Sequence, residues 1–221
     1  MTIMIERSTT RDLDTLRTGA ESAPASEGFD FLQRNKRQDK PRTHGITEIR
    51  GPYYTPLGKR VLSDILDTMG RYVDTLKFAG GSFTLMPFSE LVELISLCHE
   101  HKVLVSTGGF IERVLTQGES AVDRYLGTCL DAGFDIIELS SGFITLPAND
   151  WLRLVERVRN LGLKAKPEVG IQFGAGGATS AAELETEGTH DAAWMIQLAR
   201  RFLDAGAYQI MIESEGITEN V

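Results

Sequence analysis

Short apolar segments and helix-like segments alternate along this chain with a period of about 30 residues, the size of one strand-helix unit. The apolar segments read as buried strands that begin near His44, Val73, Val103, Asp135, Lys164 and Tyr208. Apolar residues at helical spacing lie between them, for example Leu91, Val92, Ile95 and Cys98. Such an alternation predicts a parallel sheet that is covered by helices.

Two architectures fit this pattern, a (β/α)8 barrel and an open doubly wound sheet. The first strand-to-helix turn, residues 49–54, contains no GxGxxG motif, and the chain has no P-loop, which argues against a nucleotide-binding open sheet. We therefore predict an α/β fold of the (β/α)8 TIM-barrel type. Because eight units need about 250 residues, the six visible units predict a C-terminally truncated barrel that lacks about two units.

The first 40 residues differ from the rest of the chain. They are rich in charged and hydroxyl residues and have one apolar cluster, at Phe29, Phe31 and Leu32. We predict a disordered N-terminal arm over residues 1–40 and a barrel domain over residues 41–221.

Composition restricts the possible partners. The net charge of −8 disfavours binding to a nucleic-acid backbone. No apolar run approaches the roughly 18 residues of a membrane-spanning helix, so no membrane partner is expected. Cys98 and Cys129 lack CxxC spacing, which predicts buried free thiols in a reducing compartment. The sequence thus predicts a cytoplasmic protein, and the exposed strand edges of an incomplete barrel predict a homo-oligomer.

Glu138 lies near the carboxyl end of the predicted strand Asp135–Leu139. A carboxylate there is costly to bury unless it is paired, protonated or metal-bound. One interpretation is a partner for a structural lysine or arginine. The other is a ligand or an acid-base group at the mouth of a barrel, where the active sites of such folds lie.

Other strand ends also carry polar residues. Acidic side chains lie at the ends of four predicted strands, at Glu48, Glu138, Glu168 and Glu213, and Lys77 ends the second strand. Converging carboxylates with a lysine suggest a divalent cation with oxygen ligands, most naturally Mg²⁺. The glycine-rich loops after the second and third strands offer backbone N–H groups to an anion such as phosphate.

Several of these segments together resemble one known family. The segments are Lys77-Phe78-Ala79-Gly80-Gly81-Ser82, Ser106-Thr107-Gly108-Gly109, Gly133 to Gly142, Glu168-Val169-Gly170, and Asp204-Ala205-Gly206-Ala207 before Ile210 to Glu213. Their order and spacing resemble the phosphosulfolactate synthase family over residues 41 to 221. That family also contains plant heat-stress-associated relatives.

The resemblance implies a (β/α)8 carbon-sulfur lyase that adds sulfite to phosphoenolpyruvate with Mg²⁺, giving (2R)-phospho-3-sulfolactate in coenzyme M biosynthesis. It implies catalytic roles for Lys77 and Glu168, and Lys166 is a further catalytic candidate from its place on the same strand as Glu168. The substrate-binding residues would be Arg50, Gly80, Gly81, Thr107, Gly108, Ser140 and Ser141. The metal ligands would be Glu138, Glu168 and Glu213.

The sequence departs from the family pattern at three places. Gly170 is followed by Ile171-Gln172-Phe173, where the family continues into lysines, one of which is a candidate general acid. Lys166 shares the strand face of Glu168, so it is either a substitute acid or a salt-bridge partner. Ser141 stands where the family has an acidic residue, and residues 174–189 form a long insert, interpreted as a phosphate loop, a mobile lid or a linker.

Two alternatives to the lyase therefore stay open. One is another Mg²⁺-dependent barrel enzyme that acts on a phosphorylated or carboxylated small molecule. The other is a non-catalytic, heat-stress-associated protein that works through protein contacts.

Overall fold

The structure, a computed structural model, describes residues 29, 31–33, 35–51, 57–140, 142–144, 146–170 and 192–212. The chain divides into two units, Met1–Arg37 and Gln38–Val221. In the first unit the rings of Phe29 and Phe31 lie 6.1 Å apart, and Leu32 N–H donates to the Phe29 carbonyl. The second unit contains all the described strands and helices.

In the described part of the chain, six strands form one parallel sheet in chain order. They are β1 (Glu48–Arg50), β2 (Thr75–Lys77), β3 (Leu104–Ser106), β4 (Ile136–Leu139), β5 (Lys164–Val169) and β6 (Met211–Ile212). Every neighbouring pair is parallel. The predicted strand positions and order are thus confirmed, and a doubly wound sheet, whose order would reverse about its first strand, is excluded.

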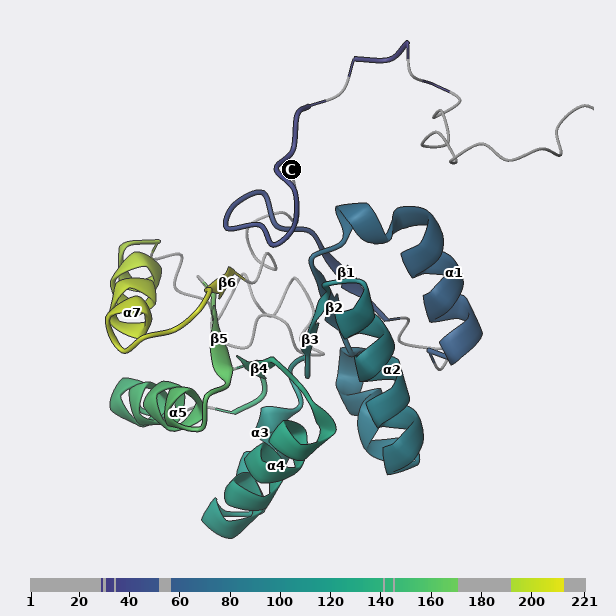
Figure 1. The fold of residues 1–221 in the computed structure, drawn as a ribbon. Helices are drawn as coiled ribbons and strands as arrows, with labels where there is room; N and C mark the ends of the chain where they lie inside the picture. Colours follow the sequence, from purple (N-terminus) through teal and green to yellow (C-terminus); the bar gives the residue numbers. More distant parts are fainter. Residues whose placement is uncertain are drawn as a thin grey trace, which may run out of the picture. The chain divides into compact units, whose positions relative to one another are not determined.

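Helices follow the strands, as the period predicts, and Figure 1 shows them around the outside of the strands. They are α1 (Lys59–Met69), α2 (Phe88–Glu100), α3 (Ile111–Leu115), α4 (Glu119–Ala132), α5 (Ala148–Asn160) and α7 (Ala192–Asp204), with 3-10 helices η2 (Gly70–Tyr72) and η3 (Ala79–Leu85). The short α3 was not predicted, because five residues are too few to show a periodic apolar stripe.

The sheet is curled. Lys166 Nζ on β5 lies 2.8 Å from a carboxylate oxygen of Glu48 on β1. In a flat sheet, four strand spacings of about 4.8 Å would put these strands roughly 19 Å apart, beyond the reach of the two side chains. Lys77 on β2 and Met211 on β6 meet in the same way, with Nζ 3.4 Å from Sδ. The described strands therefore form a curled half-barrel, which confirms the TIM-barrel-like prediction.

The two faces of the sheet differ in chemistry. Leu76, Val105 and Ile137 face the helices and are fully buried in one hydrophobic core with residues such as Leu126 and Val155. The inner face carries polar residues instead, since Lys77 pairs in register with Ser106, and Glu138 pairs with Lys166. A polar interior needs internal partners for its charges or a ligand to receive them.

The amino end of the sheet is tied down by the segment before β1. Lys40 Nζ donates 2.7 Å hydrogen bonds to the carbonyls of Gly70, Val73 and His101. Arg42 forms a buried 2.8 Å ion pair with Asp74, whose other oxygen accepts the Thr47 N–H. These contacts fix the start of β1 and leave the opposite, carboxyl end of the strands for the site.

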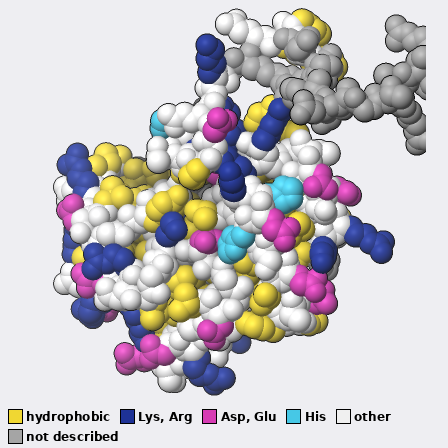
Figure 2. Space-filling view, viewed as in Figure 1, with side chains coloured by type: hydrophobic (Ala, Val, Ile, Leu, Met, Phe, Trp, Pro, Cys, Tyr) yellow, Lys and Arg dark blue, Asp and Glu magenta, His cyan; other side chains and the backbone are white. Residues whose placement is uncertain are grey.

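On the surface in view, Figure 2 shows acidic and basic side chains interspersed with hydrophobic ones. Within the described ranges, no helix has the length and apolar character needed to cross a bilayer.

Candidate functional site

Glu138 lies at the centre of the inner face. Its side chain is only 2% exposed, and its carboxylate meets two lysines: Lys77 Nζ lies 2.8 Å from Oε1 and Lys166 Nζ lies 3.1 Å from Oε2. The Lys166 contact is an ion pair without hydrogen-bond alignment, because Oε2 accepts no well-directed hydrogen bond from the described residues. Glu138 thus brings two ammonium groups together near the carboxyl end of the sheet.

A second carboxylate extends this network. Lys166 Nζ donates to both oxygens of Glu48, at 2.9 and 2.8 Å. Two lysines and two glutamates alternate across the interior, so their formal charges cancel. Lys77 is the more accessible of the two lysines, with 14% of its side chain exposed against 5% for Lys166.

Glu138 does not fit the predicted role of a magnesium ligand. Both of its oxygens face ammonium groups at 2.8 and 3.1 Å, which occupy the positions that a cation would need and would repel it. Among the residues that the structure describes, no three His, Cys, Asp or Glu side chains gather closely enough to hold a metal ion. Of the other two predicted ligands, Glu168 lies buried on the same face and has interactions of its own, and Glu213 lies outside the described residues.

The predicted glycines adopt conformations that other residues rarely take. Gly81 has a φ of +71°, and a Cβ there would lie 2.0 Å from the Phe110 ring. Gly108 has a φ of +63°, and its Cβ would lie 2.2 Å from the carbonyl oxygen of Phe78. The Gly108 and Gly109 N–H groups donate to no acceptor among the described residues. The glycines therefore let two loops pack closely.

Two other predicted substrate-binding residues use their hydroxyls within the protein. Thr107 is fully buried; its Oγ1 donates to the Gly108 carbonyl and lies 3.3 Å from the Glu138 N–H. Ser140 Oγ donates to the Gly109 carbonyl at 3.0 Å. Thr107 supports the backbone of Glu138, and Ser140 joins the loops that follow β3 and β4.

Glu112 on α3 is a functional candidate that the sequence did not reveal. Its carboxylate is buried and accepts three backbone N–H groups of the loop after β4: Gly142 at 3.1 Å, Phe143 at 2.6 Å and Ile144 at 2.9 Å. Because the partners are backbone groups, no side-chain pattern in the sequence marks this contact.

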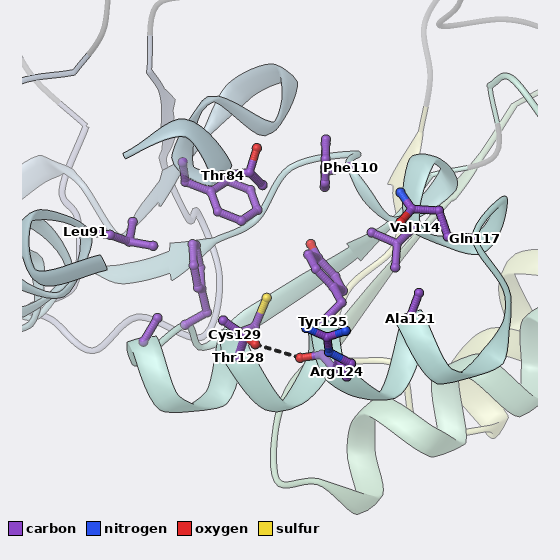
Figure 3. Close-up of a pocket in the computed structure, with 13 residues that line it drawn as sticks. Thr84, Leu91, Phe110, Val114, Gln117, Ala121, Arg124, Tyr125, Thr128 and Cys129 are labelled. Atoms are coloured by element: carbon purple, nitrogen blue, oxygen red, sulfur yellow. Dashed lines mark hydrogen bonds between the residues drawn. The ribbon is translucent and has the colours of Figure 1, made fainter. Parts of the chain in front are cut away.

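A separate cavity lies on the helix side of the sheet (Figure 3). It measures about 350 Å³ and is lined by residues of η3, α2, α3 and α4 together with Phe110, Gln117 and Phe134. Burial raises the pKa of Cys129, in its wall, to about 12. The hydroxyl of Tyr125 is buried without a well-directed hydrogen bond in the described part of the chain, and burial raises its pKa well above the usual value. This cavity is aromatic and lies outside the charged inner face.

Comparison with known sequences decides the family. The profile described as (2R)-phospho-3-sulfolactate synthase (ComA) matches residues 35–221, which is most of the chain. The chain belongs to the phosphosulfolactate synthase family.

Two relatives show the range of this family. The chain is 38% identical over 197 residues to Protein HEAT-STRESS-ASSOCIATED 32 of Arabidopsis thaliana, covering 85% of this chain and 69% of that protein. It is 25% identical over 193 residues to Phosphosulfolactate synthase of Methanothermobacter thermautotrophicus, covering 87% of this chain and 69% of that protein.

Solved structures agree with the fold. The GH99 endo-alpha-mannosidase from Bacteroides thetaiotaomicron matches with a TM-score of 0.50 and 14% identity, covering 76% of this chain and 52% of that chain. At this identity the likeness shows the fold alone, a TIM-barrel-like arrangement.

Some of the residues implied by the phosphosulfolactate synthase family lie together in the structure, and others lie outside the described residues. It brings Lys77, Lys166 and Glu138 together, with Glu168 on the same buried face. Arg50 pairs in register with Lys77 and has interactions of its own. Ser141, Glu213 and the insert at 174–189 lie outside the described residues.

Proposed function

We propose that this chain is a phosphosulfolactate synthase-like lyase, which adds sulfite to phosphoenolpyruvate to give (2R)-phospho-3-sulfolactate. The observation that carries the proposal is the convergence of Lys77 and Lys166 on one buried carboxylate, Glu138, at the inner face of a family barrel. The amides of Gly108 and Gly109, which have no acceptor among the described residues, lie in the adjacent loop. Two ammonium groups and two such amides form a suitable receptor for a small molecule with phosphate and carboxylate groups.

In this mechanism the sulfite sulfur attacks the methylene carbon of phosphoenolpyruvate. The carbon-sulfur bond forms, the π electrons of the double bond move to the adjacent carbon, and negative charge spreads onto the carboxylate. Lys77, the more accessible lysine, stabilises that charge. Lys166 then donates the proton to the adjacent carbon. It takes the place of the family's lysine after Gly170, where this chain has Ile171-Gln172-Phe173 instead.

Binding of Mg²⁺ remains a prediction. Glu138 is committed to lysines, so a metal ion in this site would depend on Glu168 and on the oxygens of the substrate. Assays with and without Mg²⁺ test this part of the proposal separately.

The test is to replace Lys77 by Met and measure sulfite-dependent consumption of phosphoenolpyruvate. We expect the rate to fall by about 100-fold or more, the order of loss seen when one stabilising donor is removed. The fold should survive, because Glu138 keeps its contact with Lys166 at 3.1 Å. Thermal unfolding of both proteins checks this point.

Lys59→Met is the matched control, since Lys59 is 61% exposed and pairs with Glu93 on the surface. It should leave the rate unchanged. Absence of phosphoenolpyruvate consumption by the unmutated protein would remove the lyase proposal. Binding of phosphoenolpyruvate without sulfite-dependent turnover would instead favour a different barrel enzyme acting on a phosphorylated or carboxylated molecule.

A second candidate function is a non-catalytic role in heat stress. It is favoured by the higher identity to the protein named heat-stress-associated, 38% against 25% for the named synthase. This candidate predicts neither turnover nor binding of phosphoenolpyruvate, together with an effect of the protein on survival after heat treatment.

A further inference from the structure

The loop after β4 is held by a carboxylate from a different element. Gly142, Phe143 and Ile144 point three successive N–H groups at Glu112, 30 to 32 residues earlier in the chain, at 2.6 to 3.1 Å. Glu112 is 4% exposed, so the carboxylate depends on these hydrogen bonds to offset its loss of water. A buried carboxylate with three charge-assisted hydrogen bonds is a strong tether.

This loop follows β4, the strand that carries Glu138, whose carboxylate contacts the two lysines. Gly142 follows Glu138 closely in the chain, and Ser140, between them, donates to the Gly109 carbonyl. A Cβ added at Gly109 would lie 2.9 Å from Ser140 Oγ and 3.6 Å from Glu138 Oε1, so the two loops are in close contact beside Glu138. A shift of the loop after β4 would therefore move the wall of the site.

The hydrogen bonds to Glu112 also occupy three backbone N–H groups that could otherwise bind an anion. Three convergent backbone N–H groups at a strand end form a concavity suited to phosphate or carboxylate. Glu112 already fills it with a carboxylate of the protein. The Gly108 and Gly109 amides have no such acceptor among the described residues.

We propose that Glu112 is a positioning residue for this site, which fixes the loop at Gly142 to Ile144 and directs the anionic end of the substrate to the Lys77 and Gly108 side. The inference rests on the proposed function for the identity of the substrate. The tether itself does not depend on it. A misplacement of about 1 Å can cost on the order of 100-fold in rate, so loss of the tether should be visible in catalysis.

The experiment compares the full chain with Glu112→Gln, Glu112→Ala and a control, Glu119→Gln. Glu119 lies at the start of α4 with its side chain 86% exposed, so the control makes the same charge change without touching the loop. Glu112→Gln preserves side-chain volume and one acceptor oxygen, which guards against a trivial loss of folding. The readouts are amide hydrogen exchange at residues 142–144, KM and kcat for phosphoenolpyruvate, and affinity for phosphoenolpyruvate by calorimetry.

We expect the three amides to be protected in the unmutated protein and in the control. Glu112→Ala should expose all three to exchange, and Glu112→Gln at least one, because its amide nitrogen cannot accept a hydrogen bond. KM and the calorimetric Kd should rise about tenfold or more in Glu112→Ala, with a smaller change in kcat, since Lys77 and Lys166 are retained.

Two results would overturn the inference: fast exchange at residues 142–144 in the unmutated protein, or unchanged exchange and affinity in folded Glu112→Ala. If the unmutated protein neither binds nor converts phosphoenolpyruvate, the proposed function fails. In that case the exchange measurement still decides whether the tether exists, and a protected loop without phosphoenolpyruvate binding rejects the substrate-directing role.

Discussion

Glu138 illustrates how a residue's chemistry depends on its neighbours. A carboxylate that is 2% exposed needs compensation, and two lysines provide it at 2.8 and 3.1 Å. The arrangement supports the lysine-partner interpretation of the sequence. It also gives Glu138 a role in the proposed catalysis that needs no metal contact, because the same ion pairs hold Lys77 and Lys166 in place.

At the residue scale, we predict opposite effects for two glycine-to-alanine substitutions. Gly81→Ala should lower the free energy of unfolding by more than about 1 kcal/mol, because its φ is +71° and its Cβ would enter the Phe110 ring. A Cβ added at Gly127, inside α4, would meet no atom within 4 Å, so Gly127→Ala should raise this free energy by roughly 0.5–1 kcal/mol. Urea unfolding measures both, and a neutral Gly81→Ala would contradict the packing.

The helices lie as the period predicts, although their ends differ by a few residues. Ser120 with Asp123 resembles a capping box that would start a helix at Ala121, yet α4 begins two residues earlier, at Glu119, with Gly118 at the N-cap position. In the same way, Ser89 is a plausible N-cap by sequence, yet α2 begins at Phe88 with Pro87 at the N-cap position, so Ser89 lies inside the helix. Neither N-cap residue makes a side-chain capping hydrogen bond.

At the element scale, α2 and α4 bury Cys98 and Cys129, and burial raises the pKa of each thiol from 9.0 to about 12. Folding therefore favours the protonated thiols. The stabilisation of the fold by the two protonated thiols is fully present below about pH 9. It is lost as the pH rises toward 12, and the free energy of unfolding then falls by about 1 kcal/mol per pH unit for each thiol.

The measurement is urea unfolding between about pH 7.5 and 10.5, with Cys98→Ala and Cys129→Ala as comparisons. We expect a shallower decline of stability above about pH 9 in each variant, and no reaction of the native thiols with a disulfide reagent at about pH 8. Equal pH slopes in all three proteins would show that the thiols are not buried as described.

At the scale of the whole molecule, the curl of the sheet brings the charged residues of the site together. Lys166 and Glu48 are 118 residues apart, and they meet because β1 and β5 face each other across the interior. The same curl brings Lys77 to Met211. The oligomeric state, the compartment and the arm at residues 1–40 stay predictions.

At this scale, we predict that Lys166→Met destabilises the fold by about 3–5 kcal/mol, because it removes the partner of Glu48 and one partner of the buried Glu138. Adding Glu138→Gln should recover part of the loss, which a double-mutant cycle by urea unfolding will show. Lys59→Met, on the surface, should have no measurable effect. Strictly additive losses would mean that Lys166 and Glu138 do not interact.

The sequence alone predicted the positions of the strands and helices, because strand and helix periodicity are local properties of the chain. It also placed Lys77 and Glu138 near the carboxyl ends of their strands. Those features follow from spacing, and the structure confirms them.

Only the tertiary structure decided which charges meet. Whether Glu138 binds a metal or lysines depends on distances across the barrel, and the Glu48 contact with Lys166 depends on the curl of five strands. Glu112 was missed because its partners are backbone N–H groups, which every residue except proline carries. Such contacts leave no mark in the sequence, since the fold alone brings them within hydrogen-bond distance.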